Sequence, residues 1–140
     1  MDRALNMLGL ARKGGMAELG EEPTGAAARA LHAHLILVAS DASDHTWRRA
    51  KSFAAGTNQQ CIRVPYTKDE LGFIIGRTSL AMAAITDPAM ALSFVKALPE
   101  PQKYADAAAS LEERVKRVRQ RQKEEKAHQR NIHRGRKKKD

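Results

Sequence analysis

Leu35-Ile36-Leu37-Val38-Ala39 is the clearest strand in the sequence and decides the fold class. The run contains no polar residue, whereas a strand with one face in water alternates apolar and polar side chains. It therefore predicts a strand whose sheet is covered on both faces. The loop 40–44 that follows is dense in residues that cap helices, so a helix is expected to begin near Asp44.

Outward from this strand, helical and extended segments alternate. Thr67 and Glu70 form a capping box, and Asp87-Pro88 is typical of a helix start. The expected helices span residues 2–12, 23–31, 44–55, 67–76 and 87–98, and the expected strands span 16–19, 35–39, 61–64 and 80–86. This alternation predicts an α/β fold, a three-layer sandwich around a small, mostly parallel or mixed sheet.

Size and composition fit one domain with an appendage. The 140 residues are 42% hydrophobic and only 4% aromatic, and the apolar runs are too short to span a membrane. The first residues lack the order of a signal peptide, and the single Cys61 excludes a disulfide framework and a multi-cysteine metal site. We therefore expect a cytoplasmic protein.

The positive charge is concentrated at the C-terminus. Residues 111–140 contain thirteen basic and five acidic residues, whereas residues 1–110 contain twelve and eleven. Prolines at 99 and 101 indicate a division into a domain (1–98) and a basic extension (99–140). The extension is predicted to be helical from 104 to about 129, with a thin apolar stripe, and disordered over 130–140 in the free protein.

The extension indicates a polyanionic partner. A lopsided terminal run of cations favours polyanion binding over mere solubility, and the absence of a bulky apolar face favours nucleic acid over a membrane.

The sequence offers little for catalysis. His32 and His34 are two residues apart, so their rings should diverge rather than share a metal ion, and Cys61 is interpreted as a small core residue. Glu21 and Glu22 have no visible partner for acid–base chemistry. We expect no enzyme, cofactor, metal site or small-molecule substrate, and keep an enzyme using Cys61 or the histidine pair as a third hypothesis.

Two loops have shapes suited to RNA. Residues 20–24 present backbone N–H groups at a helix N-terminus, and residues 76–79 offer a guanidinium and two hydroxyls. In an α/β sandwich these loops could lie at the same end of the sheet and form one platform. The nearby Trp47 is interpreted as a core residue rather than a base-stacking platform.

Several separated motifs resemble one family in order and spacing. They are Leu8-Gly9-Leu10-Ala11-Arg12-Lys13-Gly14-Gly15, Gly20-Glu21-Glu22, Leu35 to Ser43, Glu70-Leu71-Gly72 with Gly76, and Ala84-Ile85-Thr86-Asp87. Over residues 2–98 the chain resembles the ribosomal protein L-seven-Ae / L-thirty-e family, in its bacterial YlxQ-like branch. The resemblance implies an α-β-α sandwich around a mixed four-stranded sheet and binding of kink-turn RNA.

The resemblance also assigns the loops. A family loop that reads sheared G·A pairs has the pattern Gly-x-Asn-Glu-x-x-Lys, on which Gly20, Glu22, Pro23 and Ala26 fall in this order. The family's second loop, which covers flipped-out nucleotides, falls on residues 77–80. Glu22, Pro23 and Ala26 depart from the pattern, and each lost base contact costs about 1–3 kcal/mol. We therefore expect weakened or altered kink-turn recognition, partly offset by the basic extension.

Together these observations predict a non-enzymatic RNA-binding protein, ribosome-associated, that docks a structured, kink-turn-like RNA. Its expected partners are structured RNA such as ribosomal RNA, and other ribosome or translation components. The candidate RNA-binding residues are Arg12, Lys13, Gly20, Glu21, Glu22, Thr24, Arg77, Thr78, Ser79, Leu80, Arg134, Arg136, Lys137, Lys138 and Lys139. The alternative is a protein-interaction module that keeps the fold but has lost specific RNA recognition.

Overall fold

A mixed four-stranded sheet lies at the centre of the computed structural model, which describes the backbone of residues 2–139 and the side chains of residues 2–132. The strands are β1 (Ala17–Leu19), β2 (Leu35–Val38), β3 (Gln60–Arg63) and β4 (Met82–Ile85). Their order across the sheet is β1-β4-β2-β3; β4 is antiparallel to both neighbours, and β2 and β3 are parallel. The predicted mixed sheet is confirmed.

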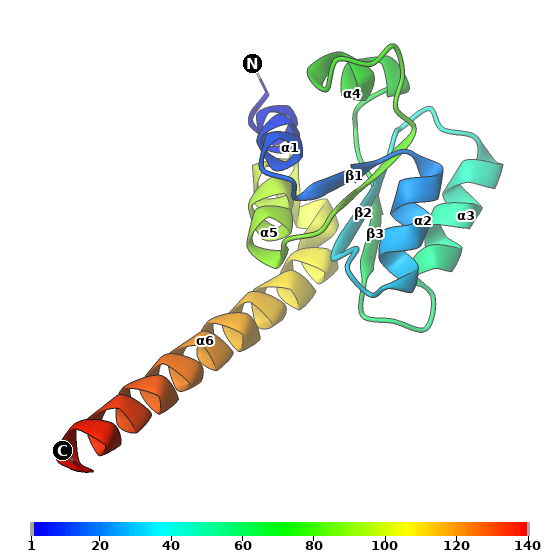
Figure 1. Cartoon of the computed structure of the whole chain (residues 1–140). Helices are drawn as coiled ribbons and strands as arrows, with labels where there is room; N and C mark the ends of the chain where they lie inside the picture. The colour runs from blue at the N-terminus through cyan, green and yellow to red at the C-terminus, as the bar shows by residue number, and fades with distance from the viewer. Residues whose placement is uncertain (1, 140) are drawn as a thin grey trace.

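Helices cover both faces of this sheet (Figure 1). The helices are α1 (Arg3–Lys13), α2 (Glu21–Arg29), α3 (Asp44–Ala54), α4 (Lys68–Ile74), α5 (Pro88–Ala97), a 3-10 turn η1 (Pro101–Tyr104) and α6 (Ala105–Lys139). Helices α2 and α3 lie on one face, and α1, α5 and the start of α6 lie on the other. The predicted three-layer α-β-α sandwich with a C-terminal helical extension is confirmed.

The apolar run 35–39 supplies the centre of both cores. Leu35 and Leu37 pack with Phe94 on the α1/α5 side, whereas Ile36 and Val38 pack on the α2/α3 side. All four β2 side chains are buried, because successive side chains of a strand point to opposite faces and here both faces are covered.

The predicted helix caps are also present. The Thr67 hydroxyl accepts a hydrogen bond from the Glu70 N–H at 3.1 Å, and the Glu70 carboxylate accepts one from the Thr67 N–H at 3.1 Å. The Asp87 carboxylate accepts the Met90 N–H at 2.8 Å at the start of α5. These caps satisfy N–H groups that the helices leave unpaired, and each cap stabilises the folded protein by about 1 kcal/mol.

The observed helix bounds lie within two residues of the predicted ones, except at the end of α6. Helix α2 begins at Glu21 rather than Pro23, and a proline is tolerated here because its missing N–H has no partner anywhere in the first turn. Helix α6 continues to Lys139, beyond the expected end near residue 129. The expected disorder of residues 130–140 in the free protein stays a prediction, and residue 140 lies outside the described residues.

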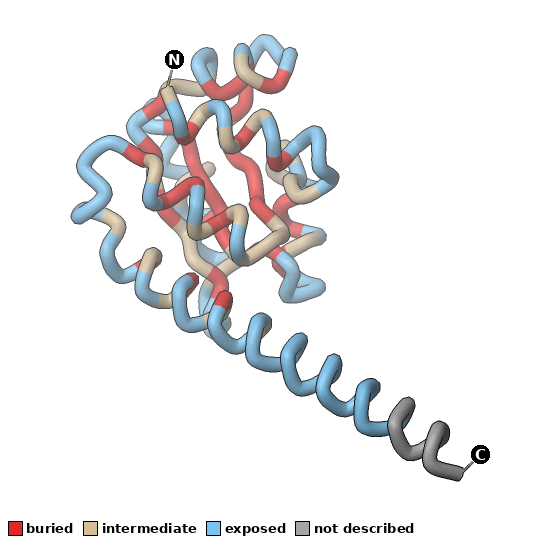
Figure 2. Tube along the Cα trace, turned by 90° about the vertical axis from the view of Figure 1, so that its left-hand side faces the viewer, coloured by how far each residue is buried: buried red, intermediate tan, exposed pale blue. Residues whose placement is uncertain are grey.

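The start of α6 belongs to the packed body. Ala107 and Leu111 lie in the same core as α1 and α5, Val115 is 6% exposed, and Val118 is half-buried. Residues 116–132, which we call the arm, then extend from the body almost entirely exposed (Figure 2). No helix in the described part of the chain is long and apolar enough to cross a membrane.

Candidate nucleic-acid interface

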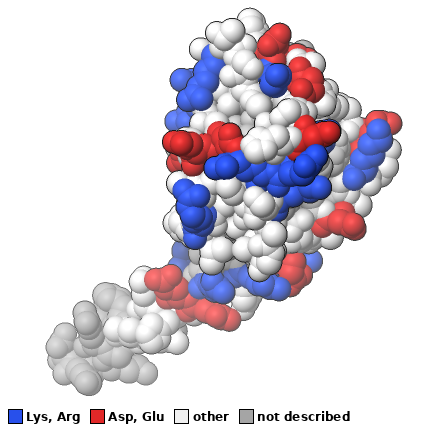
Figure 3. Space-filling view, turned by 90° about the vertical axis from the view of Figure 1, so that its right-hand side faces the viewer, with Lys and Arg blue, Asp and Glu red and all other residues white. Residues whose placement is uncertain are grey.

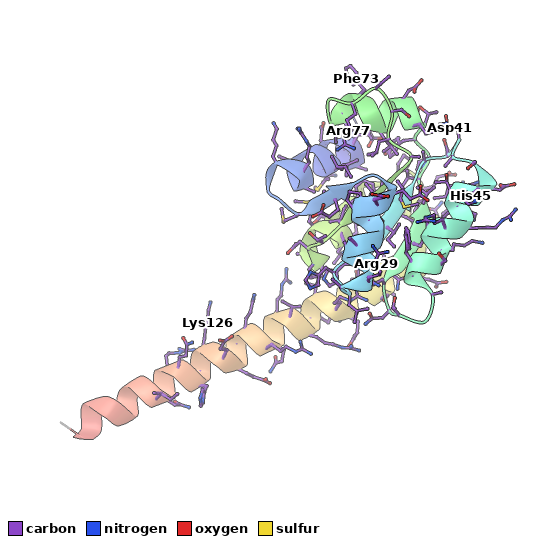
Figure 4. All side chains as sticks on the ribbon, turned by 45° about the vertical axis from the view of Figure 1, so that its right-hand side comes forward. Arg29, Asp41, His45, Phe73, Arg77 and Lys126 are labelled. Carbon is purple, nitrogen blue, oxygen red and sulfur yellow. The ribbon has the colours of Figure 1, made fainter. Side chains whose placement is uncertain are left out.

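The two predicted RNA loops lie side by side at one end of the sheet. The Gly20 N–H donates to the Met82 carbonyl at 2.8 Å, which ties the β1–α2 turn to the start of β4. A Cβ atom at Gly20 would lie 3.9 Å from Nη1 of Arg77. Figure 4 shows Arg77 at this end of the body, near Phe73 of α4. The predicted juxtaposition of the loops is confirmed.

Gly20 gives the first loop its shape. It is the N-cap of α2 with φ +100°, a conformation that L side chains rarely adopt, and it offers no side chain to cap the helix. The N–H groups of the first turn of α2 therefore have no side-chain acceptor at the cap, which is the arrangement that receives anions.

The two acidic residues of this loop have different surroundings. The Glu21 carboxylate lies 2.6 Å from Nε of Arg49, so its charge is offset within the protein. The Glu22 side chain is exposed, and the described residues include no ion-pair partner for it. Glu22 is thus the unfavourable charge for a phosphate approaching this turn.

Close contact with α4 holds the second loop. The Arg77 N–H donates to the Gly72 carbonyl at 2.8 Å, and the Leu80 N–H donates to the Lys68 carbonyl at 3.0 Å. A Cβ atom at Gly72 would lie 2.7 Å from the Ser79 nitrogen, so only glycine permits this approach. The side chains of residues 77–79 consequently face solvent, and the described residues include no salt-bridge partner for Arg77.

Two predicted site residues lie in the interior instead. The Thr24 side chain is fully buried, and the Leu80 side chain, 3% exposed, is part of the α1/α5 core. Both positions fall in RNA-suited loops by sequence, but their side chains point inward. Their side chains support the loops from inside, and the predicted RNA contact of Thr24 and Leu80 stays a prediction that their backbone groups would have to meet.

Arg12 and Lys13 are exposed at the end of α1. Together with Leu10 and Ile74 they line a hollow of about 390 Å³ between α1 and α4. Beside it, Phe73 is 81% exposed, a surface aromatic that the sequence analysis missed. Helical spacing could have predicted this exposure. Leu71 and Ile75 are buried, and Phe73 lies two residues from each of them, so it faces the opposite side of the helix.

The basic extension leaves from the other end of the sheet. Ser110 Oγ accepts a hydrogen bond from Gln60 Nε2 at 3.0 Å at the start of β3, whereas the Gly20 turn lies beside Met82, which pairs with Val38 at the end of β2. The loops and the arm therefore cannot meet the same phosphates. The side chains of Arg134, Arg136, Lys137, Lys138 and Lys139 lie outside those described.

Charge on the α2/α3 side is mixed. Figure 3 shows basic groups with acidic groups between them on this side, without a single-sign field. Trp47 is half-buried here, with the Arg63 guanidinium 4.9 Å from its ring centre and Lys51 Nζ at 5.4 Å. Trp47 also packs against the α2/α3 core, so it is part of the sandwich rather than a free stacking surface.

Solved structures share this fold. A protein of unknown function from Bacillus halodurans superposes with a TM-score of 0.61 at 20% identity, over 80% of this chain and 99% of that chain. The Giardia lamblia 15.5kD RNA binding protein superposes with a TM-score of 0.59 at 14% identity, over 74% of this chain and 85% of that chain. The fold is that of a known RNA-binding protein. No protein-family model and no curated protein sequence matches the chain.

The groups kept for the enzymatic hypothesis are poorly placed for chemistry. Burial raises the pKa of the Cys61 thiol to about 12, against a smaller opposite effect of Lys51, so the reactive thiolate is disfavoured. His34 Nδ1 lies 2.7 Å from Nη1 of Arg114, whereas the His32 side chain is exposed. The two imidazoles therefore have different surroundings.

The His34 contact helps to fasten α6 to the body. Since the guanidinium can only donate, Nδ1 must accept and the imidazole is neutral. Burial lowers the pKa of His34, the Arg114 and His32 charges lower it further, and Asp87 acts in the opposite direction. Arg114 Nη2 also donates to the Asn58 carbonyl, so protonation of His34 would place two cations in contact at this joint.

Acid is therefore expected to destabilise the fold through His34. A histidine whose folded pKa lies below the unfolded value of about 6.5 contributes stability that is complete above that pH and is lost as pH falls. Urea unfolding between about pH 7.5 and pH 5 should show this loss, and the loss should shrink in His34→Gln, which keeps an acceptor without titrating. Identical pH profiles for the two proteins would contradict the assignment.

Proposed function

We propose that this protein is a non-enzymatic RNA-binding protein of the L-seven-Ae / L-thirty-e family, in its bacterial YlxQ-like branch. It docks a structured, kink-turn-like RNA in the cytoplasm in association with the ribosome. One observation carries the proposal: the Gly20 turn and the exposed Arg77 lie side by side on a fold shared with an RNA-binding protein.

Each loop has its own part in this docking. The N–H groups at the start of α2 receive a phosphate or a base edge, and Arg77 supplies the positive charge next to them. The Arg49–Glu21 ion pair reduces the repulsion that the acidic turn would otherwise exert. Arg12 and Lys13 extend the positive surface along α1.

Three residues limit how the first loop can read RNA bases: Glu22, Pro23 and Ala26. At these three positions the family has an amide, a carboxylate and an ammonium group. This chain instead has the exposed carboxylate of Glu22, no N–H at Pro23 and only the methyl group of Ala26. Direct reading of base edges is therefore reduced, and most of the affinity comes from phosphate contacts and from recognition of RNA shape.

Arg77→Gln is the sharpest test of the loop platform. Removing this cation is expected to weaken binding of a kink-turn RNA by about 5- to 150-fold, which corresponds to about 1–3 kcal/mol. Arg29→Gln is the matched control, since Arg29 is also exposed but lies at the far end of α2 (Figure 4). Equal affinities for the two variants would contradict a role of Arg77.

Specificity needs a second RNA. The full chain is expected to prefer a kink-turn over the same RNA with its G·A pairs replaced by Watson–Crick pairs. Equal binding of both RNAs would remove kink-turn recognition from the proposal.

The exposed Phe73 favours a second candidate, a protein-interaction module. It lines a hollow of about 370 Å³ with Leu5 and Ile74 between α1 and α4, and a large exposed aromatic side chain is typical of binding surfaces. Failure of the full chain to distinguish the two RNAs, together with unchanged RNA binding in Arg77→Gln, would favour this candidate.

A further inference from the structure

The cations of the arm are sorted onto one face of α6. Five of them follow one another at spacings of three, four, three and four residues: Lys116, Arg119, Lys123, Lys126 and Arg130. At about 100° per residue they fall within an arc of roughly 80°, and the stripe spans about 21 Å along the helix. All five side chains are exposed, and Figure 2 shows that the arm is exposed along almost its whole length.

The acidic residues of the arm avoid this stripe. Four of its cations, from Arg119 to Arg130, have no acidic residue three or four positions away on either side. The two remaining arginines of the arm do. Arg117 Nε lies 3.7 Å from the Glu113 carboxylate, and Arg121 has Glu124 and Glu125 three and four residues ahead.

Such a stripe is unfavourable in an isolated helix. Like charges three or four residues apart repel and weaken the helix, and beyond Val118 no core packing offsets this repulsion. A row of anions along the same face would turn each repulsive pair into attraction to a common partner. The regular spacing of about 5 Å between successive cations suits a polymer with regularly repeated charge better than a single small anion.

The stripe also argues against a helical protein partner. A coiled coil needs apolar residues at a spacing of three and four, whereas this chain has lysine and arginine at that spacing. A membrane-surface helix needs a bulky apolar face, and among the arm residues described only Ala127 and Ile132 are apolar besides Val118. A phosphate backbone fits the face without either requirement.

We propose that the stripe Lys116–Arg119–Lys123–Lys126–Arg130 binds the phosphate backbone of an RNA duplex flanking the site held by the loops. The inference rests on the proposed RNA-binding function and adds a second, separate contact. Because the arm leaves from the opposite end of the sheet to the Gly20 turn, it meets a different stretch of the RNA from the bend.

Two matched double variants of the full chain test whether the stripe is the face of the arm that binds RNA. Arg119→Gln/Arg130→Gln removes two arginines from the stripe, and Arg117→Gln/Arg121→Gln removes two from elsewhere on the same arm. Binding is measured across a salt series to a kink-turn RNA whose flanking duplex is longer than the stripe. Circular dichroism checks that both variants keep the helix content of the wild type.

The expected result is specific to the stripe. Each lost phosphate contact reduces the slope of log K against log salt by about 0.9, so the stripe variant should lose about 1.8 and the other variant close to zero. Affinity of the stripe variant should fall by about tenfold or more at low salt and converge with wild type near 1 M. Shortening the flank to half the stripe length should reduce the wild-type slope in the same way.

Other outcomes overturn the inference. Equal changes in the salt-dependence slope for both variants would show that all cations of the arm attract the RNA alike and that no face of the helix is preferred. No change in either would show that the arm does not contact this RNA, which would favour an acidic protein partner. Failure of the proposed function is distinguished by the wild type, because it would appear as equal binding of kink-turn and Watson–Crick RNAs whatever the variants do.

Discussion

Ending the chain at residue 100 is expected to lower the free energy of unfolding by about 5 kcal/mol, whereas ending it at residue 118 should change it by less than about 1 kcal/mol. The shorter chain loses Leu111 and Val115, which are 0% and 6% exposed, together with buried Ala107. Burying large aliphatic side chains contributes about 1.5–3 kcal/mol each, and a methyl group about 0.8. The longer chain loses only solvated residues.

The measurement is urea unfolding of the two truncated chains beside the full chain. Since domains of this size are stable by about 5–15 kcal/mol, the shorter chain is expected to lose a third or more of the free energy of unfolding. Leu111→Ala in the full chain gives the same information where the shorter chain does not fold, with an expected loss of about 2–5 kcal/mol. Equal midpoints for both truncations would contradict the packing of α6 on α5.

The same comparison separates the two proposed RNA contacts. The chain ending at 118 retains both loops and the core-facing turns of α6 but lacks most of the stripe. It is therefore the suitable fragment for measuring the loops alone, whereas a cut at the prolines confounds loss of RNA contacts with loss of stability.

Gly72→Ala is expected to destabilise the protein by about 1–3 kcal/mol and to disturb the proposed RNA-binding loop 76–80, whereas Gly9→Ala should stabilise the protein by about 0.5–1 kcal/mol. Both glycines lie inside helices. A Cβ at Gly72 would meet backbone atoms of Arg77 and Ser79 at 2.7–2.8 Å, which no side-chain rotation can relieve. A Cβ at Gly9 would meet Ile74 at 3.9 Å, an ordinary contact.

Thermal unfolding and RNA binding check this pair. Gly72→Ala should lower the melting temperature and weaken kink-turn binding together, because the loop that presents Arg77 must move away from α4. Gly9→Ala should raise the melting temperature and leave binding unchanged. A Gly72→Ala protein with wild-type stability would show that the loop does not pack on α4 as described.

Much of the fold followed from local signals. The apolar run 35–39, the Thr67–Glu70 capping box and the Asp87 cap each depend on a few neighbouring residues, so a sequence pattern is sufficient to predict them. The alternation of helices and strands then left few architectures, and the three-layer sandwich was among them.

The candidate site was less predictable. The composition of the loops at 20–24 and 76–80 is sufficient to identify them. It does not predict which of their side chains point into the core and which point into solvent. Thr24 and Leu80 turned inward and Phe73 turned outward. Whether a loop side chain faces the core or the solvent depends on elements distant in the sequence that pack beneath it, and composition contains no such information.

The sequence by itself determined the strands, the helix caps, the concentration of positive charge in the basic extension, and the spacing of the cations along the arm. All of these are properties of residues that are close together in the chain. Only the tertiary structure decided that Gly20 lies beside Arg77, that His34 meets Arg114, and that the arm leaves from the far end of the sheet. The reason is that these relations depend on strand order and on helix packing across the two cores. Contacts between residues far apart in the chain form only when the whole sandwich has assembled.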